Sequence, residues 1–508
     1  MNYRRRFPAL LLVLILALSA VLVSCRTSGG GDKDSGSGNN SGQESDGKYH
    51  STAPVKDYKG ATFTVGGIDP NIYSSMILDF DFEENPQDTV QSAVYKRNRI
   101  VEDIYKVKFV NEYIGYYTET PGVLDNMVGS DDSKYQLIML VQRDALSRVI
   151  SGYAMAASEI PYLDFDQPWY ISKMNDAFNA DGIQLLAYTD SIMNAYMQTI
   201  CVFFNMGMIS ENPGLENPYE LVDKGSWTIE KFYSMCSMAM NDVNADSEYN
   251  VADGDVFGVV GEFDSFYPSV WIGSGLKAIS VDRRGQYSFS ASGNEKFIDV
   301  VSKLSDVVNT PGMYCSSTDQ FSDRSSDGDV MRDAGTKYFS TNGALFRIGC
   351  VGYIQLMRDM EADFGVMPLP KYDESQSEYL TRTCDGWIHI VPNTTGQNRE
   401  LLGTMIDSLG AESRNQVIPA FFETTLNYKL IRDEDKPKTQ EMLDIIFNNA
   451  TMDLGDTFIE IFTSPIMKAI TDGNGNFSST IGMLESSVNQ YLRETQEKIA
   501  DLKGQLGQ

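Results

Sequence analysis

The chain has 508 residues, a length that suggests two or more globular domains. Its 70 acidic and 41 basic residues give a net charge of −29, which excludes general nucleic-acid binding because so acidic a surface repels phosphate backbones. Only two histidines occur, His50 and His389, so a His-rich zinc site and any catalysis that needs two histidines in one pocket are also excluded.

The first 24 residues have the pattern of a bacterial lipoprotein signal. Three arginines precede the uncharged run Ala9–Val23, which is too short for the ~20 residues that span a bilayer. The run ends in Leu-Val-Ser-Cys25, which resembles a lipobox, where the cysteine receives a lipid and the peptide is cut before it. We therefore expect residues 1–24 to be removed and Cys25 to anchor the chain at the outer face of the bacterial cytoplasmic membrane, as its only membrane contact.

Residues 25–50 are predicted to form a flexible linker. Gly, Ser, Asn and charged residues dominate this stretch, and nothing in it can form a hydrophobic core. At ~5–6 Å × √n for a flexible chain, such a linker has a mean span of about 27 Å. It would therefore tether the folded part of the chain to the lipid.

The stretches after the linker predict an α/β fold. Tyr58–Val65 alternates and is rich in β-branched residues, which indicates a strand. A helix is expected over Ser92–Tyr105 and a short strand over Lys106–Asn111, and Tyr135–Val141 is nearly all apolar, as buried parallel strands are. An apolar stripe over Leu484–Leu502 predicts a helix that packs on a lobe, with a partner-binding helix as the alternative. We expect mainly parallel sheets in two lobes, because about 450 ordered residues exceed what one core supports.

Several stretches, in the same order along the chain, resemble the carbohydrate-type extracellular solute-binding proteins of bacterial ABC importers. Val202–Asn205 is similar to the strand where the chain of these proteins crosses between lobes, although Met206 replaces the usual lysine. The resemblance extends over most of residues 56–454. Besides the stretches above, it rests on Asn217–Leu221, Ser226–Phe232, Asn342–Phe346 and Asp363–Pro370.

The resemblance implies a two-lobed, periplasmic-binding-protein-like (type II) α/β fold with hinge-crossing strands. Residues 51–195 and 385–430 would form lobe 1, and residues 196–384 and 431–508 would form lobe 2. It further implies a monomeric, non-enzymatic receptor that needs no cofactor, captures a mono- or oligosaccharide between its lobes and delivers it to ABC permease subunits. A surface carbohydrate-active enzyme or adhesin, and a binding protein for peptides or polyamines, are the alternatives.

The sequence contains no catalytic signature of the common kinds. G-x-S-x-G, the P-loop and H-E-x-x-H are absent, while a paired-carboxylate glycosidase is not excluded by composition. The cysteines after Cys25 are widely spaced and contain no C-x-x-C, which excludes a disulfide framework or a cysteine metal site. A single bridge between Cys315 and Cys350, or between Cys350 and Cys384, stays open.

Candidate ligand-binding residues follow from the chemistry of sugars, which need aromatic rings surrounded by carboxylates, amides and arginines. We expect an uncharged carbohydrate stacked on at least one of Trp169, Trp271 and Trp387, because the chain is acidic and no cluster of Arg or Lys is expected near the crossings. Trp227 is assigned to the core. The other candidate contacts, in loops near the expected strand ends and crossings, are Asp69, Arg143, Asp144, Gln198, Asp264, Phe266 and Asp385.

The acidic stretch 242–253 matches a calcium loop in part. Oxygen-bearing side chains stand at loop positions 1, 3, 5, 9 and 12, and alternate residues of such loops point at the ion. Ser247 stands where glycine normally makes the sharp turn, so an ordinary acidic surface loop is the alternative. The predicted structural calcium would be held by Asp242, Asn244, Asp246, Glu248 and Asp253.

Overall fold

Every element of the computed structural model described below belongs to the unit Gly42–Gln508. The predicted signal, Cys25 and most of the linker lie outside the described residues. No helix in the described part combines the length and the apolarity needed to cross a membrane. The structure describes residues 47–69, 80–84, 86–322, 328–357, 360, 362–384, 386–426, 436–473 and 475–506.

The first sheet, which defines lobe 1, has the strand order β14-β3-β1-β2. Its strands are β1 (Ala61–Gly67), β2 (Val107–Tyr113), β3 (Leu137–Val141) and β14 (Trp387–Ile390). Strands β2 and β3 run parallel to β1, whereas β14 runs antiparallel to β3. Every residue of β3 is buried, which confirms the prediction of a strand covered on both faces.

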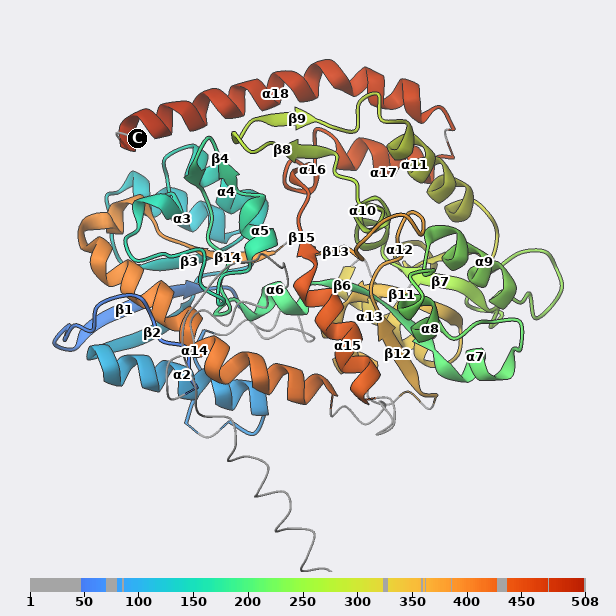
Figure 1. Cartoon of the computed structure of the whole chain (residues 1–508), viewed down its shortest axis with the longest axis horizontal. Helices are drawn as coiled ribbons and strands as arrows, with labels where there is room; N and C mark the ends of the chain where they lie inside the picture. The colour runs from blue at the N-terminus through green and yellow to red at the C-terminus, as the bar shows by residue number, and fades with distance from the viewer. Residues whose placement is uncertain are drawn as a thin grey trace, which may run out of the picture. The chain divides into compact units, whose positions relative to one another are not determined.

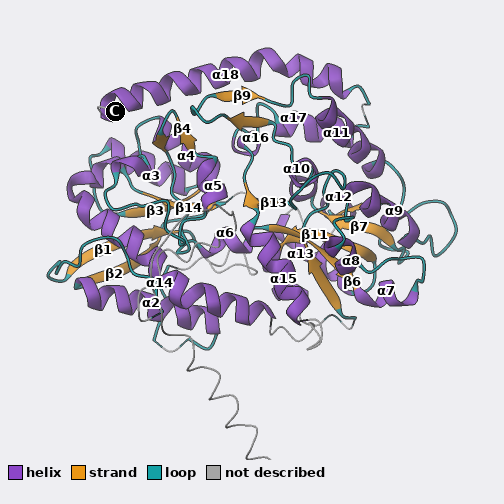
Figure 2. Cartoon of the chain, viewed as in Figure 1, coloured by secondary structure: helices purple, strands orange, loops and turns teal. Residues whose placement is uncertain are grey.

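Helices cover both faces of the first sheet, as the α/β prediction required (Figures 1 and 2). Helix α2 begins where the Asp88 carboxylate accepts hydrogen bonds from the N–H groups of Val90 and Gln91, and it packs against the long helix α14. The helices and short strands of this lobe are α2 (Thr89–Tyr105), α3 (Thr120–Gly129), α4 (Gln142–Ile150), α5 (Ser172–Asp176), β4 (Asn179–Ala180), β5 (Ile183–Gln184) and α14 (Arg399–Leu426).

The second sheet, which defines lobe 2, has the order β10-β7-β11-β6-β12. Its strands are β6 (Ile200–Asn205), β7 (Phe257–Gly261), β10 (Tyr314–Ser316), β11 (Ala344–Cys350) and β12 (Phe364–Met367). Strands β10, β7 and β11 are parallel, and β6 is antiparallel to both of its neighbours. The surrounding helices are α7 (Met206–Glu211), α8 (Pro218–Asp223), α9 (Ile229–Ala239), α10 (Phe263–Gly273), α11 (Glu295–Val308), α12 (Ser317–Gln320), α13 (Gly328–Ser340) and α15 (Lys436–Asn448).

The chain passes between the two sheets more than once. Short helix α6 (Met193–Met197) leads from lobe 1 into β6, and β13 (Thr381–Arg382) leads from lobe 2 into β14. Helix α15, the next described element after α14, packs on β12 of lobe 2. The crossing strands β6 and β14 are both antiparallel members of their sheets, and this arrangement confirms the two-lobed fold with hinge-crossing strands.

The C-terminal elements lie against both lobes. Helix α17 (Thr463–Thr471) packs on α10 and α11, and the long helix α18 (Phe477–Leu506) contacts α11, α17, β9 and α4. The buried residues of α18 include Val488, Leu492 and Ile499, which confirms that this stripe packs on the folded body. The remaining elements are β8 (Ile279–Val281), β9 (Tyr287–Phe289), β15 (Ala450–Thr451) and α16 (Leu454–Thr457).

Candidate functional site

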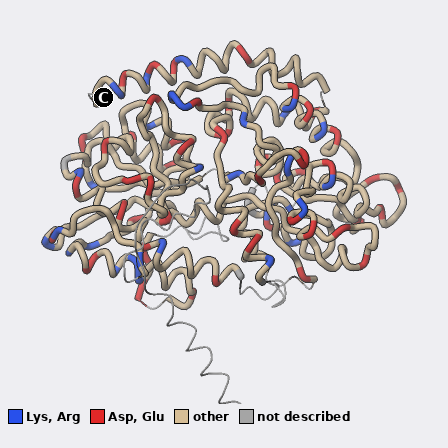
Figure 3. Tube along the Cα trace, viewed as in Figure 1, with Lys and Arg blue, Asp and Glu red and all other residues tan. Residues whose placement is uncertain are grey.

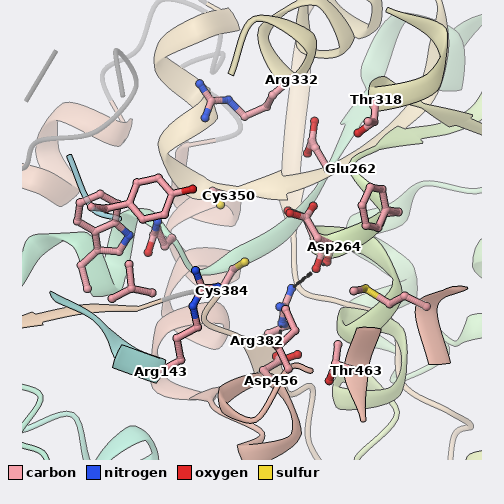
Figure 4. A pocket seen from close by; sticks show the side chains of 18 of the residues that line it. Arg143, Glu262, Asp264, Thr318, Arg332, Cys350, Arg382, Cys384, Asp456 and Thr463 are labelled. Atoms are coloured by element: carbon pink, nitrogen blue, oxygen red, sulfur yellow. Dashed lines mark hydrogen bonds and ion pairs between the residues drawn. The ribbon is translucent and has the colours of Figure 1, made fainter. Parts of the chain in front are cut away.

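A cavity of about 380 Å³ lies between the two sheets, where the strand ends of both lobes meet (Figure 4). Because β14 is antiparallel to β3, with Trp387 opposite Val141, the first residue of β14 lies at the carboxyl end of β3. Ligands of open α/β sheets bind at this edge. The lining residues are Tyr116, Tyr117, Val141, Arg143, Gln198, Glu262, Phe263, Asp264, Ser265, Thr318, Arg332, Cys350, Tyr353, Arg382, Cys384, Trp387, Asp456, Ile459, Thr463 and Met467.

Aromatic rings line the cavity from both lobes. In lobe 1 the rings of Tyr116 and Tyr117 lie 4.5 Å apart between centroids, and Tyr117 lies 5.9 Å from Trp387. Phe263, at the start of α10, and Tyr353, just after β11, are the rings from lobe 2. Such rings can stack on the apolar C–H faces of a sugar or on a flat organic ligand.

Arginine–carboxylate pairs supply the polar groups of the cavity. Arg382, which is 4% exposed, donates from Nε to Asp456 at 2.6 Å and from Nη1 to the carbonyl of Asp264 at 2.8 Å. Arg332 pairs with Asp333 at 2.9 Å. Each pair compensates its own charge and places polar atoms at the cavity wall.

Glu262 is held in place from behind by a buried arginine. Arg347 is fully buried on β11, and its Nη2 donates to both carboxylate oxygens of Glu262, at 2.7 and 3.0 Å. The same guanidinium contacts Thr336 and lies 4.9 Å from the Tyr353 ring. The cavity therefore presents Glu262 in a fixed orientation, because a buried guanidinium nitrogen that donates to both of its oxygens leaves the carboxylate little freedom.

The crossing segments form the floor of the cavity. The backbone N–H of Cys384 donates to the carbonyl of Gln198 at 3.0 Å, so the two passages are hydrogen-bonded to each other. Gln198 is 6% exposed and lines the cavity directly before β6. Cys350 and Cys384 also line the cavity, and neither they nor Cys201, Cys236 and Cys315 form a disulfide. Burial raises the pKa of the Cys350 thiol to about 12.

Four of the residues proposed from the sequence meet in this cavity: Arg143, Gln198, Asp264 and Trp387. Figure 4 shows Arg143 on one side of the space and Glu262 and Asp264 on the other. Asp385 lies outside the described residues. The expectation that no arginines cluster near the crossings is wrong, because Arg143, Arg332 and Arg382 all line the cavity.

The other candidate tryptophans lie in the interior, away from the cavity. Trp169 is fully buried, and its Nε1 donates to Asp407 at 2.8 Å. Trp271 is also fully buried and donates to Asp453 at 3.3 Å. Both side chains are therefore held by carboxylates of neighbouring segments, and Trp227, assigned to the core, donates to the Pro368 carbonyl at 2.9 Å.

The remaining three candidates do not line the cavity either. Phe266 is fully buried and stacks near Tyr314, with ring centroids 5.2 Å apart. Asp144 pairs with Arg148 at 3.5 Å, on the side of α4. The backbone N–H of Asp69 donates to the Gly115 carbonyl beyond the end of β1. Arg143 and Ser265, each one residue before Asp144 and Phe266, do line the cavity, because one residue along a helix turns the side chain by about 100°.

The loop predicted to bind calcium is exposed and closed by its own hydrogen bonds. Asp242 accepts the backbone N–H groups of Ala245 and Ser247, at 2.7 and 2.8 Å. Those two residues have left-handed φ angles of 59° and 70°, so Ser247 adopts the turn that glycine normally makes. Asn244 donates to Asp246 and Asp253, and the backbone N–H of Glu248 donates to Asp246. In the described part of the chain, no three His, Cys, Asp or Glu side chains gather to hold a metal ion.

The sequence predictions missed most of the cavity, since only four of its twenty lining residues were among the candidates. Tyr116 and Tyr117 follow β2, Glu262 and Phe263 follow β7, and Tyr353 follows β11. The carboxyl ends of parallel strands were the signal that could have identified these residues. Residues 456–467 had no such signal, because they come from C-terminal elements outside both sheets.

Comparison with known proteins finds solved structures with a similar fold. No family profile and no curated protein matches the sequence. The structure is similar to an extracellular solute-binding protein from Staphylococcus aureus solved with maltose, at 11% identity and a TM-score of 0.56, over 86% of this chain and 98% of that one. It is also similar to the GacH receptor of Streptomyces glaucescens, solved with acarbose, at 13% identity and a TM-score of 0.52, over 85% and 99% of the two chains.

A third similar structure is an ABC substrate-binding protein from Listeria monocytogenes in complex with cycloalternan. Its identity is 11% and its TM-score 0.52, over 86% of this chain and 99% of that one. At these identities the likeness establishes the fold: the chain has the two-lobed α/β fold of ABC solute-binding proteins.

Proposed function

We propose that this chain binds a carbohydrate in the cavity between its lobes and delivers it unaltered to an ABC permease. The observation that carries the proposal is the combination, in one cavity, of aromatic rings with hydrogen-bonding groups from both lobes and the crossings. Tyr117 and Trp387 offer stacking surfaces, and Glu262, Gln198 and Arg382 offer acceptors and donors for hydroxyl groups.

The charges of the cavity favour a neutral solute. Arg382 is paired with Asp456, and Glu262 is paired with Arg347, so neither group is available to neutralise an ion. The three arginines that line the cavity, Arg143, Arg332 and Arg382, are balanced by three lining carboxylates, Glu262, Asp264 and Asp456. Acidic residues are also spread over the trace of the unit Gly42–Gln508 (Figure 3). A polyol carries no charge, so it can bind beside these ion pairs without changing their charge balance.

A ligand that contacts both lobes stabilises the closed arrangement of a two-lobed protein. The similar structures were solved with maltose, acarbose and cycloalternan, which supports a carbohydrate here. They are binding proteins, and this supports a receptor that releases its solute unchanged. The permease would then recognise the closed form.

We further propose that Cys25 carries a lipid that holds the receptor at the outer face of the membrane. The basic residues, the short apolar run and the Leu-Val-Ser-Cys sequence support this anchor, and residues 26–46 supply a polar tether. Cys25→Ala should release the protein into the medium. Unchanged retention in the membrane fraction would refute the lipid anchor.

Calorimetric titration of the soluble chain without its first 25 residues tests the carbohydrate proposal. Panels of neutral glycans, of amino acids and peptides, and of polyamines should be compared. A glycan should bind, while the peptide and polyamine panels give no heat of binding. Binding of peptides or polyamines, with no response to any glycan, would overturn the carbohydrate assignment.

A further inference from the structure

One end of the cavity is closed by C-terminal residues. Asp456, Ile459, Thr463 and Met467 all line it, and they come from α16, α17 and the turn between them. Figure 4 shows Asp456 and Thr463 at the end of the cavity opposite Arg332. We refer to residues 453–471 as the end wall.

Lobe 2 holds the end wall through buried hydrogen bonds. The Asp453 carboxylate, 1% exposed, accepts from the backbone N–H groups of Ala278 and Ile279, at 2.7 and 3.1 Å. At the other end of the wall, Ser305 of α11 donates to the Ile470 carbonyl at 3.1 Å. Because these groups are buried and paired at both ends, opening the wall would leave several polar groups without partners.

Lobe 1 also holds the end wall. The side chain of Gln142, at the first residue of α4, donates from Nε2 to the hydroxyl of Thr457, and both groups are buried. Behind the wall, α18 packs on α4 and α17, and Lys503 donates to the Asp181 carbonyl at 2.8 Å. The end wall therefore spans the gap between the lobes and is covered from outside.

The burial of the lining residues indicates where a solute enters. Thr463 and Met467 of the end wall are 1% and 6% exposed. Tyr116 of lobe 1 and Phe263 of lobe 2 are 41% and 36% exposed, so they lie at the mouth of the cavity. A solute that entered between these two rings would meet the end wall, which also lines the cavity.

We propose that the cavity is a blind pocket that takes the end of a linear carbohydrate, so that one or two sugar units fill it. This inference rests on the proposed carbohydrate function and specifies the form of its ligand. The terminal sugar would lie against Thr463 and Met467, with Asp456 and Arg382 beside it. Further units would project past Tyr116 and Phe263 into water and would add little affinity.

Two consequences distinguish a blind pocket from a cleft open at both ends. Affinity should stop rising once the pocket is full, because only units in contact with the protein bury surface. A cyclic glycan has no chain end to insert, so it should bind poorly even when its linkages match those of a good linear ligand.

The test is a calorimetric titration of the soluble chain with ladders of one to about six linked units, in several neutral series, and with a cyclic glycan of a series that binds. The dissociation constant should fall from one unit to two and then stay within about threefold. The cyclic glycan should bind at least about 100-fold more weakly than the two-unit ligand.

Variants of one wall residue give a second measurement. Met467→Ala enlarges the closed end and should improve binding of the three-unit ligand relative to the two-unit ligand by about tenfold. Met483→Ala, at a side chain of α18 that is 73% exposed, is the matched control and should change the affinity for neither ligand. A thermal melt of each variant checks that it folds.

Other outcomes would overturn the inference. A dissociation constant that keeps falling with each unit after the third would indicate a cleft open at both ends. A cyclic glycan that binds as tightly as the linear ligand would contradict end insertion while leaving the carbohydrate function intact. Absence of binding to every ladder would refute the proposed function, and with it the blind pocket.

Discussion

Replacement of Asp407 by alanine is expected to destabilise the chain strongly. Asp407 is fully buried on α14, and its carboxylate accepts from Trp169 Nε1 and from the Tyr170 hydroxyl, both at 2.8 Å. It also accepts from the Ser51 hydroxyl and the Thr52 backbone N–H, each at 2.8 Å. One carboxylate thus joins α14 to the loop before α5 and to the start of the folded chain.

The expected loss of stability follows from the hydrogen-bond donors that Asp407→Ala would leave without an acceptor. A buried donor without a partner costs about 1–3 kcal/mol, and the Trp169 and Tyr170 donors are both in the interior. The donors of residues 51–52 can hydrogen-bond to water instead, so their loss of the carboxylate destabilises the chain less. Asp407→Ala should therefore lower the free energy of unfolding by about 3–5 kcal/mol.

Urea unfolding followed by tryptophan fluorescence and circular dichroism measures this change. Glu400→Ala is the matched control, because Glu400 lies on the same helix in an exposed ion pair with Lys56 and should cost less than about 1 kcal/mol. If Asp407→Ala unfolds within about 1 kcal/mol of the parent chain, this assignment of Trp169 to a structural hydrogen bond is refuted.

Two further predictions concern calcium and pH. If residues 242–253 bind calcium, adding calcium to chelator-treated protein should raise its melting temperature by several degrees. A ligand that binds only the native state adds RT ln(1 + [L]/Kd) to the free energy of unfolding. Identical melts with and without calcium would indicate an ordinary acidic loop. Burial and the nearby Arg97 guanidinium lower the pKa of His389 to about 4, below its value of about 6.5 in an unfolded chain. The unfolded chain therefore binds the proton first, so stability is full above pH 6.5 and falls by up to about 3 kcal/mol as the pH drops to 4. His389→Leu should remove this part of the pH dependence, and an unchanged profile would contradict the assignment.

Most of the fold could be predicted because local pattern and burial agree. The strand expected over Tyr58–Val65 is β1, shifted by a few residues, and the helix expected from Ser92 begins at Thr89. The apolar run ending at Val141 is a fully buried strand. The antiparallel direction of β6 within the second sheet, and of β14 within the first, could not be deduced from periodicity. Strand direction depends on which segments cross between the lobes.

The candidate site was harder to predict, because a large aromatic residue looks the same in a core and in a cavity. Trp169, Trp271 and Trp387 are all almost completely buried, yet only Trp387 lines the cavity. The difference lies in distant partners: Asp407 and Asp453 hold the first two side chains. Such pairings join residues more than 180 positions apart, and a single sequence does not specify them.

The most direct test of the account compares two buried tryptophans in the same titration. Trp387→Phe and Trp271→Phe remove comparable side-chain volume from positions that are 1% and 0% exposed, but only Trp387 contacts the cavity. For the tightest-binding glycan, the account predicts that Trp387→Phe weakens affinity by about tenfold, through lost stacking and contact area, and that Trp271→Phe leaves it unchanged. Equal affinities for both variants and the parent chain would contradict carbohydrate binding between the lobes.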